Sequence, residues 1–116
     1  MAAQVLVIGA GPAGLASAYY LQQAGIAYRV VDRADAIGST WARLYPSLRL
    51  NTASVVSSLP GMRLPLRYGV YPTGRQFYAY LRRYAERFQF NIDLGVTVER
   101  VAPQDDGWWV ETSAGA

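Results

Sequence analysis

The N-terminal third of the chain shows two short apolar runs separated by a segment with helical spacing. Val5–Ile8 is a continuous apolar run, which predicts a strand buried on both faces of a parallel sheet. Pro12 suits the first turn of a helix, where its missing N–H would have no partner in any case. The positions that follow at helical spacing are Leu15, Ala18, Tyr19 and Gln22. After Gly25, a natural helix stop, a second apolar run, broken by Arg29, occupies Tyr28–Val31 and ends at Asp32. We therefore expect a strand, a helix and a second, parallel strand.

The middle of the chain contains an irregular stretch followed by a second predicted helix. Residues 33–71 are interrupted by glycines and prolines with serines and threonines between them, which predicts a long irregular excursion. Loops of this length usually carry function or cover a site. Thr73 then predicts a helix start, because Gln76 three residues later completes a capping box. Four side chains of that helix form one apolar stripe, which we expect to face the core: Phe77, Leu81, Tyr84 and Phe88.

The C-terminal quarter has the period of β-strands. Ile92–Leu94 predicts a third parallel strand, and two further runs flank a turn at Asp105–Gly107, which predicts a hairpin. The chain ends at Ala116 without an element that completes the sheet, so we expect a truncated domain. The first strand, Val5–Ile8, would then keep an unpaired edge, and we expect the protein to self-associate through that edge.

The amino-acid composition limits the kinds of catalysis and ligand that we expect. The chain contains no cysteine and no histidine, so we expect no metal site and infer that any catalysis depends on a cofactor. Its eleven basic residues are all arginines, scattered along the chain, and the net charge is only +3, which argues against a nucleic-acid partner. No apolar run approaches the roughly 18 residues of a membrane span, and no signal peptide is evident. We therefore expect a cytoplasmic protein without a membrane partner.

The strongest motif lies between the first strand and the first helix. Gly9, Gly11 and Gly14 form a G-x-G-x-x-G pattern. The first glycine permits a tight turn, the second lets a pyrophosphate approach the backbone, and the third lets the helix pack closely on the sheet. The motif is completed by Pro12 and Ala13, at the helix start where free N–H groups attract phosphate. A glycine-rich turn without ligand is the alternative.

Asp32 strengthens the dinucleotide interpretation. It follows Gly14 by eighteen positions, close to the usual offset of about 20, and its carboxylate can accept hydrogen bonds from an adenosine ribose. A 2′-phosphate would be repelled there, although Arg33 weakens this exclusion. These features predict an α/β fold: residues 1–116 form the N-terminal part of a Rossmann-like FAD-binding domain with a parallel sheet and a C-terminal hairpin.

The segment after Asp32 favours FAD over NAD. Residues 36–41, AIGSTW, resemble the flavin-containing monooxygenase and Baeyer–Villiger monooxygenase families, in which an acid is followed by glycine-glycine-x-tryptophan. Ser39 stands where these families have their second glycine, and Asp32 where they more often have glutamate. The resemblance covers nearly the whole chain and continues through Tyr45–Thr52, Tyr71, Pro72, Phe77, Tyr80 and Leu81.

The resemblance implies a function and further site residues. In these families NADPH reduces FAD, which reacts with dioxygen to give a flavin peroxide that oxygenates a small organic substrate. By resemblance Gly9, Gly11 and Gly14 bind the pyrophosphate and Asp32 the ribose. Trp41 would lie near the flavin or, alternatively, anchor a loop on the core. Asn51 would donate a hydrogen bond beside the flavin as the candidate catalytic residue, or merely stabilise a turn. Arg49 and Arg75 could contact phosphate or substrate, or they could simply be exposed to solvent.

The families' NADPH motif does not occur in these residues, so we expect the NADPH site outside this chain and no complete catalysis by the chain alone. Two other interpretations stay open. One is a different two-dinucleotide flavoprotein, such as a disulfide-reductase-like or quinone-reducing enzyme. The other is a non-catalytic module that binds an adenine dinucleotide.

Overall fold

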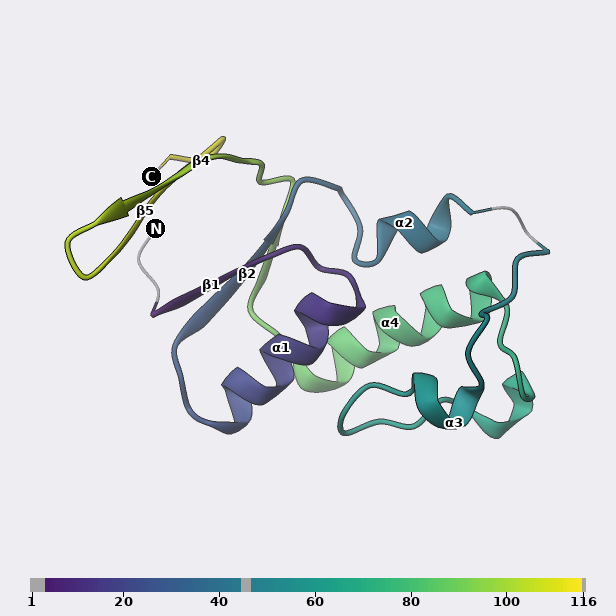
Figure 1. The fold of residues 1–116 in the computed structure, drawn as a ribbon. Helices are drawn as coiled ribbons and strands as arrows, with labels where there is room; N and C mark the ends of the chain where they lie inside the picture. Colours follow the sequence, from purple (N-terminus) through teal and green to yellow (C-terminus); the bar gives the residue numbers. More distant parts are fainter. Residues whose placement is uncertain (1–3, 45–46, 116) are drawn as a thin grey trace.

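The computed structural model describes residues 4–44 and 47–115. A three-stranded parallel sheet lies between two long helices on one side and a separate β-hairpin on the other (Figure 1). The three strands are β1 (Val5–Ile8), β2 (Tyr28–Asp32) and β3 (Ile92–Leu94), and their order in the sheet is β1-β2-β3. Strand β2 pairs in parallel with both β1 and β3, and Val30 of β2 is aligned with Val7 of β1 and with Ile92 of β3. The predicted α/β fold with a parallel sheet is confirmed.

Strand β1 forms an edge of this sheet and pairs only with β2 among the described strands. The prediction that it is buried on both faces was wrong, because Ile8 is 60% exposed and its neighbours are only half-buried. Only the face that carries Val7 packs against the core formed with the helices. A continuous apolar run therefore marked a strand correctly without fixing how many of its faces are covered.

Both long helices begin where the sequence predicts, and α1 also ends before the predicted stop at Gly25. Helix α1 covers Pro12–Gln23, and the chain leaves it through Gly25 at a positive φ of 69°. Helix α4 covers Gly74–Phe88 and begins with a complete capping box. The Gln76 amide N–H donates to Oγ1 of Thr73 over 3.1 Å, and the Thr73 amide donates to Oε1 of Gln76 over 2.9 Å. Two of the free N–H groups at this helix start are thereby satisfied.

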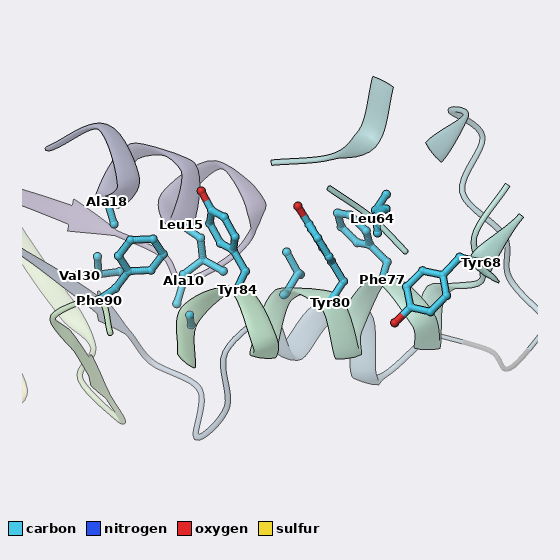
Figure 2. Close-up of a cluster of buried hydrophobic side chains, with 12 residues drawn as sticks. Ala10, Leu15, Ala18, Val30, Leu64, Tyr68, Phe77, Tyr80, Tyr84 and Phe90 are labelled. Carbon is cyan, nitrogen blue, oxygen red and sulfur yellow. The ribbon is translucent and has the colours of Figure 1, made fainter. Parts of the chain in front are cut away.

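The apolar stripe of α4 forms much of the core. Its rings and those of neighbouring segments gather between α4, α1 and the sheet (Figure 2). Phe77, Leu81 and Tyr84 are buried, and Phe88 packs against them, as predicted. The ring centroids of Tyr84 and Phe88 lie 5.2 Å apart with an edge-to-face angle of 70°. Such pairs stabilise a core beyond the area that they bury.

The excursion over residues 33–71 is irregular, as predicted, and its described residues form three short helical turns. These are α2 (Ser39–Ala42), α3 (Ser54–Ser57) and the 3₁₀ turn η1 (Leu66–Tyr68). Two phenols of α4 hold the excursion against the core. The Tyr84 hydroxyl donates to the Pro60 carbonyl over 2.6 Å, and the Tyr80 hydroxyl donates to the Met62 carbonyl and accepts from the Leu59 amide. Burial raises the pKa of Tyr84 and, less strongly, that of Tyr80.

The predicted hairpin is also confirmed. Strands β4 (Val98–Gln104) and β5 (Gly107–Thr112) pair antiparallel, and Asp105 in the turn has a positive φ of 47°. None of the helices formed by the described residues is long and apolar enough to cross a membrane. Within the same residues, no cluster of three or more acidic, histidine or cysteine side chains could hold a metal ion.

Candidate functional site

The glycine motif forms the turn that joins β1 to α1. The Gly9 amide donates to the Val31 carbonyl over 2.8 Å and so extends the pairing of β1 with β2. Gly9 has a φ of 111°, a conformation that glycine adopts without steric cost. Gly11 follows as the N-cap of α1 with extended backbone, and apart from Gly11 and its two chain neighbours no atom of the described residues lies within 4 Å of the place where a Cβ would be. The backbone at Gly11 is therefore open to a ligand.

Gly14 has a different reason to be glycine. A Cβ at this position would lie 1.8 Å from the Gly9 carbonyl oxygen and 3.0 Å from its carbon. The first turn of α1 thus packs directly on the backbone that leaves β1, which is the close packing that the motif predicts.

The N-terminus of α1 lacks a side-chain cap. Gly11 offers no side chain, and Pro12 occupies the first helical turn. The next amides, those of Ala13 and Gly14, lie in the first turn, where the N–H groups have no partner within the helix. Together with the helix dipole these groups favour an anion, although the dipole itself contributes only about 0.3 to 1 kcal/mol. Helix α4, with its capping box, offers no such end.

Asp32 lies beside this turn at the end of β2. Its Oδ2 accepts from the Ala10 amide over 2.7 Å, and its Oδ1 accepts from the Ala34 amide over 2.9 Å. The carboxylate is half-buried, whereas the neighbouring Arg33 is exposed. The structure therefore brings the predicted ribose acid to the predicted phosphate loop.

A cavity of about 320 Å³ opens next to both features. Gly9, Asp32 and Arg33 lie along one side of it. The sequence interpretation missed the contribution of segment 96–98, which ends at the first residue of β4. This segment reaches the site because the Val96 amide donates to the Asp32 carbonyl over 2.9 Å. Its alternating valines indicated only a strand, and no local pattern linked them to the glycine turn. The described residues that line the cavity are Ile8, Gly9, Val31, Asp32, Arg33, Val96, Thr97 and Val98.

A larger groove of about 890 Å³ lies elsewhere, between β1 and the hairpin. Leu6, Trp108 and Trp109 contribute to its mostly apolar lining, and Asp106 is the one charged side chain among the described lining residues. The described residues that line this groove include Ile8 at the end of β1, but neither a glycine of the motif nor Asp32. Because a dinucleotide needs phosphate donors and a ribose acceptor, the smaller cavity is the better candidate site.

Trp41 lies on α2, and its ring packs edge-to-face on Phe77 with centroids 4.8 Å apart. This contact fits the alternative in which Trp41 anchors a loop on the core, and a role near a flavin stays a prediction. Gly38, with a φ of 62°, precedes α2 and donates its amide to the Ala10 carbonyl over 3.0 Å. Ser39 is the first residue of that helix, so its position does not need a glycine conformation.

The other candidate residues lie apart from the glycine turn. The Asn51 side chain is exposed, with no hydrogen bond to the described part of the chain. The Arg49 guanidinium donates to the Tyr71 carbonyl over 2.8 Å, and Arg75 is exposed on α4. None of the three lines the 320 Å³ cavity. Tyr45 and Pro46, which belong to the family resemblance, lie outside the described residues.

Comparison with known proteins identifies the family. Residues 6–116 match the model of the pyridine nucleotide-disulphide oxidoreductases. The chain belongs to this family. An uncharacterized CzcO-like oxidoreductase of Geobacillus kaustophilus is 41% identical over 111 residues, or 96% of this chain and 32% of the relative. A probable indole-3-pyruvate monooxygenase of Arabidopsis thaliana, YUCCA9, is 40% identical over 106 residues, or 90% of this chain and 25% of the relative.

A solved structure agrees with these relatives. The flavin-containing monooxygenase from Stenotrophomonas maltophilia superposes with a TM-score of 0.89 at 30% identity, over 98% of this chain and 34% of that chain. The predicted resemblance to flavin monooxygenases within this oxidoreductase family is confirmed. The chain spans about a third or less of the length of the relatives that it matches.

Proposed function

We propose that the protein is an FAD-dependent oxidoreductase of the monooxygenase type, which uses NADPH to oxygenate a small organic substrate. The 116 residues supply the binding site for the pyrophosphate and adenosine of FAD. The proposal rests on three features that lie next to one another. They are the start of α1, where Gly11 provides no side-chain cap, the carboxylate of Asp32, and the adjoining cavity of about 320 Å³. The monooxygenase relatives support the reaction type.

The residues present fit the adenosine half of FAD. Open space over Gly11 would admit the pyrophosphate, and the amides of Ala13 and Gly14 would donate to it. Asp32 has about two lone-pair sites left after its two backbone bonds, which suits the hydroxyls of a ribose. The same carboxylate would repel a 2′-phosphate, so this site favours FAD or NAD over NADPH, which would bind outside this chain. The family resemblance favours FAD over NAD.

When bound, FAD would supply the redox chemistry, with NADPH as the reductant and dioxygen as the oxidant. The residues of this chain bind and orient the cofactor. We propose that Trp41 borders the flavin and that the Asn51 amide, which needs no titration, donates to developing negative charge beside it. Family resemblance supports both roles, and the packing of Trp41 on Phe77 would hold its ring in one orientation.

A visible absorption spectrum of the purified full-length protein, before and after NADPH is added under air, tests the proposal. We expect flavin bands that bleach with NADPH and return as oxygen reoxidises the cofactor. Gly11→Ala is the matched control, because an added methyl group meets no protein atom within 4 Å but would fill the space of the pyrophosphate. A colourless wild-type protein that takes up no added FAD would overturn the proposal.

Two alternatives predict different spectra. A disulfide- or quinone-reducing flavoprotein would bind FAD and bleach with NADPH, but its reduced flavin would react slowly with oxygen and rapidly with a disulfide or a quinone. A non-catalytic module would bind ADP and remain colourless. Adding a disulfide or a quinone to the same absorption experiment, each in turn, distinguishes the monooxygenase from these two alternatives.

A further inference from the structure

Asp32 makes contacts that ribose recognition alone does not require. Its two carboxylate oxygens accept from two backbone amides, those of Ala10 and Ala34, over 2.7 and 2.9 Å. Ala10 belongs to the glycine turn and is separated from Asp32 by 22 positions in the sequence. The carboxylate therefore links the end of β2 to the phosphate loop through protein contacts alone.

The backbone of Ala10 is held from a second side as well. Its carbonyl accepts from the Gly38 amide over 3.0 Å, and its side chain is fully buried. Asp32 and Gly38 thus hold the N–H and the C=O of the same residue, in the middle of the turn between Gly9 and Gly11. A loop fixed in this way does not have to be ordered when a dinucleotide binds, which lowers the cost of binding.

We propose that Asp32 is a positioning residue for the phosphate loop in addition to its contact with the ribose. It sets the conformation of residues 9–11 before the cofactor arrives and so contributes to pyrophosphate binding through the backbone. This inference builds on the proposed FAD site, but its first consequence concerns the ligand-free protein.

Hydrogen exchange of the ligand-free protein, followed by mass spectrometry on peptides that cover residues 9–14, tests the positioning role. We compare Asp32→Asn, which keeps the shape but loses one acceptor, with Asp32→Ala and with Asp35→Asn. Asp35 is an exposed acid three residues away, with no hydrogen bond or ion pair to the described residues, so its variant removes the same charge without touching the loop.

We expect exchange at residues 9–14 to become at least about tenfold faster in both Asp32 variants, because a hydrogen bond to a charged acceptor is lost. Exchange in α4 should stay unchanged, which separates a local effect from general unfolding. Asp35→Asn should match the wild type. Unchanged exchange at residues 9–14 in both Asp32 variants would overturn the positioning role.

A second measurement separates the loop from the ribose. Binding of ADP and of 2′,3′-dideoxy-ADP, which lacks the ribose hydroxyls, is measured for the wild type and Asp32→Ala. If Asp32 positions the loop, the variant binds both nucleotides about tenfold more weakly, even though removing a negative charge near the phosphates should strengthen binding. If the loss is confined to ADP, Asp32 acts on the ribose alone and the positioning role fails. A wild type that binds neither ADP nor FAD contradicts the proposed function, while the exchange result still decides the role of Asp32.

Discussion

Gly14→Ala tests the close packing of α1 on β1. The new Cβ would lie 1.8 Å from the Gly9 carbonyl oxygen, whereas a carbon and a carbonyl oxygen normally approach to roughly 3.3 Å. The first turn of the helix and the end of the strand must therefore separate by about 1.5 Å. Because the obstructing atom is backbone, no side chain can rotate to relieve the clash.

The energetic cost follows from this displacement. Forcing an extra methyl group into a packed site costs about 1–3 kcal/mol, and a backbone obstacle places this variant at the upper end. Alanine gains about 1 kcal/mol over glycine inside a helix, which offsets part of the cost. We expect the free energy of unfolding to fall by about 2 kcal/mol.

Urea denaturation followed by circular dichroism measures this change, with Gly11→Ala as the matched control. At Gly11 an added Cβ meets nothing within 4 Å and the φ of −88° is ordinary, so stability should change by less than about 0.5 kcal/mol. Both variants should lose FAD, Gly14→Ala because the turn moves and Gly11→Ala because the methyl group blocks the pyrophosphate. Equal stability of Gly14→Ala and wild type would refute the packing argument.

Three further predictions follow from the structure. Thr73→Ala removes half of the capping box of α4 and should lower the free energy of unfolding in urea by about 1 kcal/mol; no change would show that the cap is dispensable. Burial raises the pKa of Tyr84, so its stabilising contribution is complete below the unfolded pKa of about 10 and is lost as pH rises further. The urea midpoint of the wild type should therefore fall above pH 10, and Tyr84→Phe should flatten this fall; parallel pH curves would contradict it. Leu6→Lys places a charge on the open strand β1 and should shift a self-associated wild type toward monomer in size-exclusion chromatography, whereas a monomeric wild type would refute association through this edge.

Local interactions made much of the fold predictable. The capping box of Thr73 and Gln76 lies within four residues, and the glycine turn lies between an apolar run and a helical repeat. Each signal depends on neighbours in the sequence, so reading the sequence recovers it. The burial of Ile8 was predicted wrongly because an apolar run reports the strand and not the layers that cover it.

Long-range contacts could not be predicted in the same way. The segment 96–98 reaches the candidate site through one backbone hydrogen bond to Asp32, and the phenols of Tyr80 and Tyr84 hold loop carbonyls that lie 18 and 24 positions away. Hydrogen bonds to backbone carbonyls leave no mark in the identity of the partner residue. A sequence therefore shows which side chains can donate, while the fold decides which carbonyls receive them.

The start of α1 shows how such a site can still be recognised. The two long helices both need partners for their first amides, and α4 obtains them from Thr73 and Gln76, whereas α1 begins at Gly11 without a side chain. Glycine at an N-cap costs only a few tenths of a kcal/mol relative to serine or threonine, so the helix tolerates the loss. In return the space over Gly11 stays open, and the Ala13 and Gly14 amides at the helix start have no side-chain cap. A helix that leaves a small local preference unmet, next to a carboxylate that orders the same turn, is better explained by a ligand than by folding alone.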